Sequence, residues 1–314
     1  MIIEADFIMP KTLIVITGPT AIGKTAIAIK LAQYYNTEII SADSRQFYKE
    51  MEIGTAKPSP DELNAAKHHF LNSHSITDKF SVGDYEKKAI ELINVLFQTH
   101  DQLILAGGSG LFINAVLYGF DNIPTAAEET RNTLNELLVH RGLQPLQKML
   151  KEYDPVYYSE VDINNPQRII RAIEVCISTG RPFSEFRKKG VINRPFDFIK
   201  IGLNTNRDIL YNNINTRVDN MMERGLLEEA KLLLPYRNLN PLNTVGYSEL
   251  FNYFDRKHSL QEAIEIIKQN TRRFAKRQLT WFNKSVDIKW FEPKEFDKIT
   301  GYLNSFLYHR EPGE

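Results

Sequence analysis

Residues Gly18 to Thr25 form a candidate phosphate-binding loop near the start of the chain. Their spacing is G-x-x-x-x-G-K-[ST], and they follow the apolar run Leu13–Ile16. In such loops backbone N–H groups surround phosphate oxygens, the lysine adds a positive charge, and the threonine hydroxyl can bind Mg²⁺. A glycine turn that has a similar sequence but binds no phosphate is the weaker interpretation, because strand-like residues precede the loop and helix-like residues follow it. The predicted diphosphate-binding residues are Gly18, Thr20, Ala21, Ile22, Gly23, Lys24 and Thr25, with Thr25 as the Mg²⁺ ligand.

Asp43 is the candidate acid for this site. It follows the strand-like segment Glu38–Ala42, and ligand-contacting residues gather at the carboxyl ends of parallel strands. A conventional P-loop NTPase places an aspartate after a second buried strand, but here Gln102–Ala106 is followed by Gly107-Gly108-Ser109-Gly110. Asp43 could bind Mg²⁺ through water, accept a proton from a nucleophile, or only shape a turn with Ser44. The spacing leaves these roles open.

The elements that must position these residues have the pattern of an α/β protein. Strand-like segments occur at Leu13–Thr17, Glu38–Ala42, Gln102–Ala106 and Phe198–Leu203, with helical patterns between the first three. This alternation predicts a P-loop NTPase-like parallel sheet with helices on both faces. Gly107–Gly110 would then allow a close backbone approach beside two other strand-end motifs, although a tight turn alone is the simpler interpretation.

Helices without strands are predicted from about 125 to 194. Within them, Arg168–Thr179 has an apolar face that includes Ile173, Cys176 and Ile177, and Gly180 and Pro182 end the helix. We therefore predict a catalytic core of residues 1–124 and 195–314 and an all-helical insertion domain of residues 125–194.

A long helix is predicted from Leu260 to Phe282. Its apolar side holds Leu260, Ile264, Ile267 and Phe274. Trp281 and Phe282 are expected to pack in the core. The opposite side carries basic residues, which are Arg272, Arg273, Lys276 and Arg277.

Composition excludes several classes of protein. The 314 residues are 42% hydrophobic and 25% charged, and no apolar run approaches the ~20 residues that span a bilayer. The N-terminal residues lack an export signal, so we expect a cytoplasmic protein. The single cysteine, Cys176, excludes a disulfide framework or a cysteine-rich zinc site. His68, His69 and His74 lack the partners and spacing of a zinc centre.

Charge is balanced overall but uneven along the chain. Lys+Arg and Asp+Glu count 39 each. Residues 166–195 hold seven basic and two acidic residues, and residues 268–284 hold six basic residues and no acid. One such stretch is often a solvated helix face, but two beside a phosphate loop favour a nucleic-acid partner.

Several stretches together resemble one enzyme family, the tRNA dimethylallyltransferases, which are the isopentenyl-transfer enzymes of tRNA. The resemblance runs from Gly18 to Phe282 and is far more specific than the phosphate loop alone. Apart from that loop, it is carried by D-S-R-Q-F-Y-K at 43–49, M-E-I-G-T-A-K-P at 51–58, A-G-G-S-G-L-F at 106–112, N-P-Q-R-I-I-R-A at 165–172, V-G-Y at 245–247 and T-R-R-F-A-K-R-Q at 271–278.

The resemblance implies a reaction. A dimethylallyl group would pass from dimethylallyl diphosphate to the N6 amine of the adenosine 3′ of the anticodon, tRNA position 37, in tRNAs that read codons beginning with U. The phosphate loop would hold a prenyl diphosphate instead of ATP, and Mg²⁺ would be the cofactor. A carbon–oxygen bond breaks, so no acid is needed to aim water at a γ-phosphate. Lys24, Thr25 and Mg²⁺ would stabilise the departing pyrophosphate.

The resemblance also implies residue roles. Asp43 matches the general base, Ser109 lines the channel where the substrates meet, and Arg217 matches the arginine that contacts the diphosphate. On residues alone, Arg217 would be a surface arginine of an amphipathic helix. The positions implied to bind the tRNA anticodon stem-loop are Asp43, Ser44, Arg45, Gln46, Ser109, Arg131, Gln167, Arg168, Ile169, Ile170, Arg171, Thr244, Gly246, Tyr247, Arg273, Lys276 and Arg277.

RNA recognition in this scheme requires the target base to leave its stack, because a stacked adenosine cannot reach a buried donor. Gln46 is then a candidate reader of a base edge. Arg45 and Phe47 depart from the smaller or uncharged residues of many bacterial relatives. The zinc-finger extension of eukaryotic relatives is absent, which indicates the bacterial type.

Three alternatives remain. An adenylate isopentenyltransferase would use the same donor on free AMP or ADP, but would have less need of a basic helical insertion. A small-molecule kinase would use ATP on the same loop, but the acid expected before Gly107 is missing. An RNA-binding module without activity would not need Lys24, Thr25 and Asp43 together. We expect a monomer.

Overall fold

A parallel six-stranded sheet organises the chain, and its strand order is β3-β2-β4-β1-β5-β6. The four predicted strands are confirmed as β1 (Thr12–Thr17), β2 (Ile39–Ser41), β4 (Gln102–Ala106) and β5 (Asp197–Leu203). Two short edge strands were not predicted, namely β3 (His68–His69) and β6 (Ile288–Phe291). Each is too short to show a periodic pattern, and pairing with β2 and β5 defines them.

The computed structural model describes residues 11–121, 123–124, 126–187, 190 and 192–308. Three parts of the sequence predictions lie outside the described residues. They are the domain boundary at Thr125, the basic residues Lys188 and Lys189, and the N-terminal residues 1–10. The chain divides into two compact units. One extends to Leu117 and resumes at Arg194, and the other is Tyr118–Asn193, so the helical unit begins earlier than 125.

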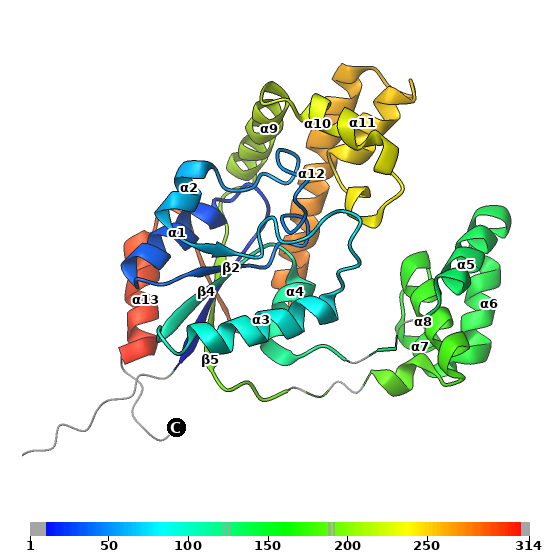
Figure 1. Ribbon diagram of the computed structural model, residues 1–314, viewed down its shortest axis with the longest axis horizontal. Coiled ribbons are helices and arrows are strands. Elements are labelled where there is room, and N and C mark those ends of the chain that lie inside the picture. Colours follow the sequence, from blue (N-terminus) through cyan, green and yellow to red (C-terminus); the bar gives the residue numbers. More distant parts are fainter. Residues whose placement is uncertain (1–10, 122, 125, 188–189, 191, 309–314) are drawn as a thin grey trace, which may run out of the picture. The chain divides into compact units, whose positions relative to one another are not determined.

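Helices cover both faces of the sheet in the larger unit. Ile14 and Ile16 of β1 belong to one buried cluster with Ile27 and Leu31 of α1 (Lys24–Tyr34). Figure 1 shows the strands between α1 and α13 on one side and α3 and α4 on the other. The remaining helices near the sheet are α2 (Pro60–Ala65), α3 (Val82–Leu96), α4 (Gly110–Tyr118) and α13 (Phe296–Tyr308).

A second core lies in the same unit beyond the carboxyl ends of the strands. It joins residues of α9 to α12 with Tyr48, Met51 and Ile76 of the loops after β2 and β3. The elements here are α9 (Arg207–Glu223), α10 (Leu226–Leu233), the 3₁₀ turns η2 (Leu234–Tyr236) and η3 (Asn240–Leu242), α11 (Tyr247–Phe254) and α12 (Leu260–Phe282).

The bounds of α12 match the prediction, but the predicted burial of part of its apolar side was wrong. Ile267 and Phe282 are buried, whereas Phe274 and Trp281 are each 39% exposed. Both aromatic side chains line a cavity, so the apolar surface of this helix extends beyond its core contact.

The helical unit contains α5 (Glu128–Arg141), α6 (Gln144–Tyr153), α7 (Pro155–Glu160), α8 (Pro166–Thr179) and the 3₁₀ turn η1 (Phe183–Phe186). Asn165 caps the start of α8, because its side chain accepts a hydrogen bond from the N–H of Arg168. Gly180 ends the helix in the left-handed conformation, as predicted. Cys176 is buried, but Ile177 is 44% exposed, so its predicted place on the apolar face was wrong.

None of the helices in the described part of the chain is both long enough and apolar enough to cross a membrane.

Candidate active site

The phosphate loop connects β1 to α1 as predicted. Gly18 has a φ of 145°, and a Cβ there would lie 2.5 Å from the carbonyl oxygen of Leu203, so only glycine fits. Gly23 has a φ of 97° and forms the N-cap of α1. Unpaired backbone N–H groups and the helix dipole favour anions at a helix N-terminus. The loop therefore has the geometry of a phosphate cradle.

Lys24 points back across this loop. Its Nζ donates hydrogen bonds to the carbonyl oxygens of Gly18 (3.0 Å) and Pro19 (2.8 Å). Burial lowers the pKa of Lys24 to about 8, Asp43 acts to raise that pKa, and Arg217 acts to lower it. The lysine is therefore a cation whose charge is sensitive to its surroundings near neutral pH.

Lys24, Asp43 and Arg217 meet at the carboxyl end of the sheet, although 174 positions separate Asp43 from Arg217. Asp43 Oδ1 accepts a hydrogen bond from the N–H of Arg45 at 3.0 Å. Burial lowers the pKa of the Arg217 guanidinium, and the nearby Asp43 carboxylate acts to raise it. Arg217 lines a cavity, so it is not the surface arginine that the helix pattern alone suggests.

The glycine-rich stretch after β4 makes a close approach to the turn after β2. A Cβ on Gly107 would lie 2.3 Å from the carbonyl oxygen of Ala42. Ser109 Oγ accepts a hydrogen bond from the N–H of Ser44 at 3.1 Å and donates one to Ser44 Oγ at 3.2 Å. The stretch therefore does more than turn the chain, because it holds Ser109 next to the Asp43 turn.

Gln278 is a site residue that the sequence analysis did not assign. Its Oε1 accepts a hydrogen bond from the N–H of Thr20 (2.8 Å), and its Nε2 donates one to the carbonyl oxygen of Gly108 (3.0 Å). The residue is only 7% exposed. It links α12 to the phosphate loop and to the Ser109 loop at once. The sequence feature that could have identified Gln278 is a polar residue on the buried side of a predicted helix.

These groups surround a cavity of about 690 Å³ within the larger unit. Ligand sites are commonly about 300–1,000 Å³ in volume, with an apolar lining and a few polar groups. Thr20, Asp43, Ser109 and Arg217 supply polar walls here. The apolar part of the lining includes Leu111, Phe112, Val218, Met221, Ile267, Phe274 and Trp281.

Arg45 and Phe47, the two departures from the family pattern, have different surroundings. Arg45 lines the cavity, and its Nη1 donates a hydrogen bond to the carbonyl oxygen of Asn240 at 3.3 Å. Phe47 is 1% exposed and stacks on Tyr85 at a ring-centroid distance of 5.2 Å. Arg45 is thus available to a ligand, whereas the Phe47 side chain belongs to the core.

Two residues implied to bind tRNA instead make internal hydrogen bonds. Gln46 Nε2 donates to the carbonyl oxygens of Thr55 and Ala56, both at 3.2 Å. Tyr247 is fully buried, so its side chain is not exposed to a ligand. Thr244 and Gly246, by contrast, line the cavity.

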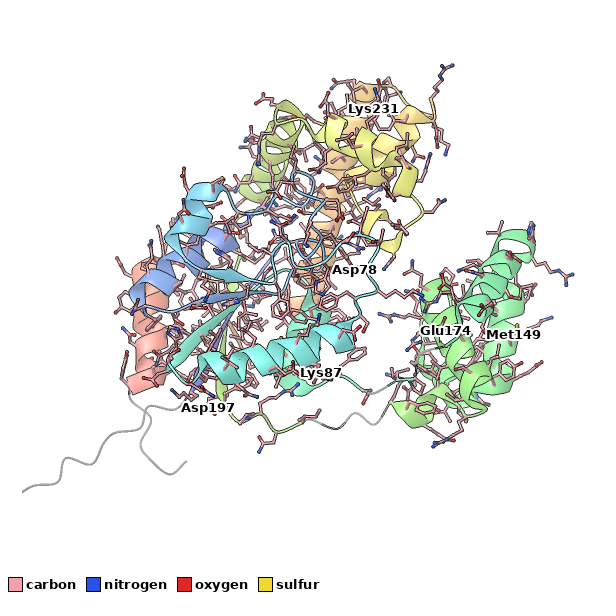
Figure 2. All side chains as sticks on the ribbon, viewed as in Figure 1. Asp78, Lys87, Met149, Glu174, Asp197 and Lys231 are labelled. Carbon is pink, nitrogen blue, oxygen red and sulfur yellow. The ribbon has the colours of Figure 1, made fainter. Side chains whose placement is uncertain are left out.

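The arginines of the helical unit are largely paired. The carboxylate of Glu174, with only 1% of its side chain exposed, accepts hydrogen bonds from Arg131 Nε (2.7 Å) and Arg171 Nη1 (2.7 Å). Figure 2 shows Glu174 among the helices of this unit. Gln167 and Arg168 are exposed. The side chains of Ile169 and Ile170 are buried in the core of the unit.

Other arginines of the basic stretch 166–195 are also paired. Arg181 bonds to Glu185 at 2.6 Å and Arg187 bonds to Glu160 at 2.7 Å. Arg194 lies in the larger unit and bonds to Glu86 at 2.6 Å. The charge excess read from the sequence is therefore smaller in the folded protein.

The basic side of α12 is divided between structure and surface. Arg272 Nη1 donates a hydrogen bond to Asn215 Oδ1 of α9 at 2.6 Å. Arg273, Lys276 and Arg277 are exposed, and Arg277 also lines the cavity, with its guanidinium carbon 5.7 Å from the Phe274 ring centroid. This helix therefore presents cations at and beside the cavity.

Comparison with known proteins identifies the fold and the family. Residues 46–285 match the model of the family described as IPP transferase. The chain is 54% identical over 298 residues to a tRNA dimethylallyltransferase of Christiangramia forsetii, covering 95% of this chain and 99% of that protein. It is 52% identical over 288 residues to a tRNA dimethylallyltransferase of Flavobacterium johnsoniae, covering 90% and 93%.

Solved structures agree. The full-length tRNA isopentenylpyrophosphate transferase of Bacillus halodurans superposes with a TM-score of 0.70 at 36% identity, covering 95% of this chain and 97% of that one. A eukaryotic dimethylallyltransferase acting on tRNA gives a TM-score of 0.78 at 25% identity, covering 97% and 81%. The chain therefore belongs to the IPP transferase family, and it is an enzyme of the prenyl-transferring kind.

Proposed function

We propose that this enzyme transfers a dimethylallyl group from dimethylallyl diphosphate to the N6 amine of the adenosine 3′ of the tRNA anticodon. The observation that carries the proposal is the cavity, in which Asp43, Ser109 and Arg217 face an apolar wall beside the phosphate loop. A prenyl diphosphate has a charged end and an apolar end, and this lining matches both. The relatives named tRNA dimethylallyltransferase support tRNA as the acceptor.

Donor binding is the first step. The N–H groups of the phosphate loop, Lys24 and Arg217 would hold the diphosphate, since positive charge and helix N-termini favour phosphate oxygens. The five-carbon chain would lie against residues such as Phe112 and Met221, which line the cavity. An apolar wall also excludes water, which would otherwise hydrolyse the activated donor.

Transfer requires a base and a stabilised leaving group. The bond between the allylic carbon and the diphosphate oxygen breaks, and pyrophosphate leaves with the electron pair toward Lys24 and Arg217. The adenine nitrogen forms a bond to the same carbon and passes a proton to the Asp43 carboxylate. Ser109 lies beside the Asp43 turn, where it would orient the incoming amine.

Mg²⁺ is the expected cofactor, and the oxygen donors of the site fit it. Thr25 offers a hydroxyl, and Mg²⁺ binds such oxygens together with the oxygens of substrate phosphates. Among the residues that the structure describes, no three His, Cys, Asp or Glu side chains form a metal site of their own. When bound, the ion would supply positive charge to the departing pyrophosphate.

The acceptor adenosine would have to be flipped out of the anticodon loop to reach this cavity. Arg45, Thr244 and Arg277 line the cavity and are the groups best placed to contact the loop. Arg273 and Lys276 would contact phosphates from the exposed side of α12. Cytoplasmic location, a monomeric state and preference for tRNAs reading codons that begin with U remain predictions.

Labelled dimethylallyl diphosphate with Mg²⁺ and purified protein tests the proposal. Separate reactions contain unmodified tRNA, the same tRNA with guanosine in place of the target adenosine, AMP or ADP. Label should enter only the unmodified tRNA with adenosine. Label in AMP or ADP alone would identify an adenylate isopentenyltransferase instead, and phosphoryl transfer from labelled ATP would identify a kinase.

A further inference from the structure

Glu229 of α10 holds a loop that belongs to the signature stretch 51–58. Its Oε2 accepts hydrogen bonds from the N–H groups of Glu52 (3.0 Å) and Ile53 (2.7 Å), and its Oε1 accepts one from the N–H of Gly54 (2.9 Å). One side chain thus satisfies three consecutive backbone donors from 175 to 177 positions away. Carboxylates bind such donors strongly because the acceptor carries a full charge.

Tyr247 completes this arrangement from a second signature stretch. Its hydroxyl donates a hydrogen bond to Glu229 Oε1 at 2.6 Å. A Cβ on Gly54 would lie 2.6 Å from the Tyr247 ring, so only glycine fits against it. The stretches 51–58 and 245–247 therefore meet at one point, and Glu229, which is part of neither, accepts hydrogen bonds from both.

The loop held by Glu229 in turn holds Gln46. The carbonyl oxygens of Thr55 and Ala56, directly after Gly54, accept both hydrogen bonds of the Gln46 amide nitrogen. Gln46 closes the turn of Asp43 by donating its N–H to the Asp43 carbonyl oxygen at 3.3 Å. Gly54, Thr55 and Asp43 all line the cavity.

We propose that Glu229 is a positioning residue. Through the 52–56 loop and Gln46 it sets the acceptor side of the cavity, which is the part lined by Asp43, Gly54 and Thr55. The donor side does not depend on it, because Gln278 ties the phosphate loop to the Ser109 loop separately. The inference rests on the proposed function in taking the anticodon loop as the acceptor. Glu229 should therefore affect tRNA binding and leave donor binding unchanged.

Glu229→Gln is the most specific test, because a glutamine side chain has nearly the same shape as a glutamate side chain. Both carboxylate oxygens accept hydrogen bonds, so an amide must turn its NH₂ toward donors. Affinity for an anticodon stem-loop should fall about tenfold, as expected when a half-buried charged acceptor loses its hydrogen bonds. Affinity for an unreactive thiodiphosphate analogue of the donor should not change. Glu228→Gln, an exposed neighbour on the same helix, is the matched control and should behave as wild type.

A double-mutant cycle with Gln46→Ala tests whether Glu229 acts through Gln46. The double variant should bind the stem-loop about as weakly as the weaker single variant, because coupled residues are not additive. Losses that multiply, or an equal loss of donor affinity, would overturn the proposal. Tyr247→Phe, which removes only one hydrogen bond to Glu229, should give a smaller loss of stem-loop affinity and is informative if Glu229→Gln does not fold.

Binding and turnover are measured on the same proteins. Wild-type protein that binds the stem-loop without prenylating it would refute the proposed reaction and leave the role of Glu229 standing. Glu229→Gln protein with wild-type stem-loop affinity would refute the role of Glu229, whatever its turnover.

Discussion

Asp43 illustrates how a single residue gains a role from its neighbours. The sequence allowed it to bind a metal, accept a proton or shape a turn. In the folded chain it faces the cations Lys24 and Arg217 and lines the cavity. A carboxylate at this position would be placed to accept a proton from an amine that enters the cavity.

Asp43→Asn keeps the shape of the side chain and its hydrogen bond from Arg45, but removes the base. Turnover should fall by about 10² or more, which is the lower range of general-base contributions, while stem-loop affinity stays near wild type. Single-turnover rates at saturating substrates together with equilibrium binding measure the two quantities. An unchanged single-turnover rate would remove Asp43 from the base role.

Lys24 should make the binding of the proposed donor depend on pH. Burial lowers its pKa to about 8, so the side chain is charged below that pH and increasingly neutral above it. The dissociation constant of the donor analogue should be constant below pH ~8 and rise above it, because an anion binds less well to a neutral lysine. Titration calorimetry from pH 6.5 to 9.5 measures this, and Lys24→Met corrects for ionisation of the ligand. The same dependence in Lys24→Met would exclude Lys24 as its source.

At the scale of elements, the helical unit depends on a buried carboxylate. Glu174 of α8 pairs with Arg131 of α5 and Arg171 of its own helix, and its side chain is only 1% exposed. The pair with Arg131 joins α5 to α8. They also mean that Arg131 and Arg171, which were implied to bind tRNA, have a structural partner.

Glu174→Gln should destabilise the helical unit by about 1–3 kcal/mol, because a buried side chain loses charge-assisted hydrogen bonds to two partly exposed arginines. Chemical denaturation followed by circular dichroism measures the change. Glu185→Gln, which breaks the exposed pair with Arg181, should cost less than about 1 kcal/mol. Equal effects of the two substitutions would show that burial does not set the strength of these pairs.

At the scale of the whole molecule, the helical unit is inserted at a single place in the catalytic unit. Arg194 closes that place, because its Nε and Nη2 donate hydrogen bonds to the carbonyl oxygens of Val116 and Ala115, each at 2.8 Å. The chain leaves and re-enters the catalytic unit at neighbouring points. A unit inserted in this way can be removed without breaking the sheet.

Replacement of residues 118–193 by a short glycine linker should leave affinity for the donor analogue unchanged and weaken tRNA binding. The dependence of tRNA affinity on salt should also become shallower, since fewer phosphate contacts release fewer counterions. Binding measured from 50 to 300 mM KCl tests both expectations. An unchanged salt slope would mean that the helical unit makes no contacts with tRNA phosphates.

Features that arise from local chemistry could be predicted from the amino-acid sequence. The glycine spacing of residues 18–25 predicts a loop between strand and helix. Nearly continuous apolar runs predicted β1 and β4, and hydrophobic periodicity predicted the full length of α12. These patterns depend on residues a few positions apart, so they can be read without the fold. The resemblance likewise drew attention to Arg217, which lines the cavity.

Which polar side chains pair with one another became apparent in the folded protein. Tyr247, Glu174 and Gln278 meet their partners across 18 to 258 positions of chain. No local pattern distinguishes an arginine bonded to a buried carboxylate from one in solvent, because pairing depends on packing between distant elements. Burial of these groups therefore distinguishes side chains with a structural partner from those that line the cavity or lie on the exposed side of α12.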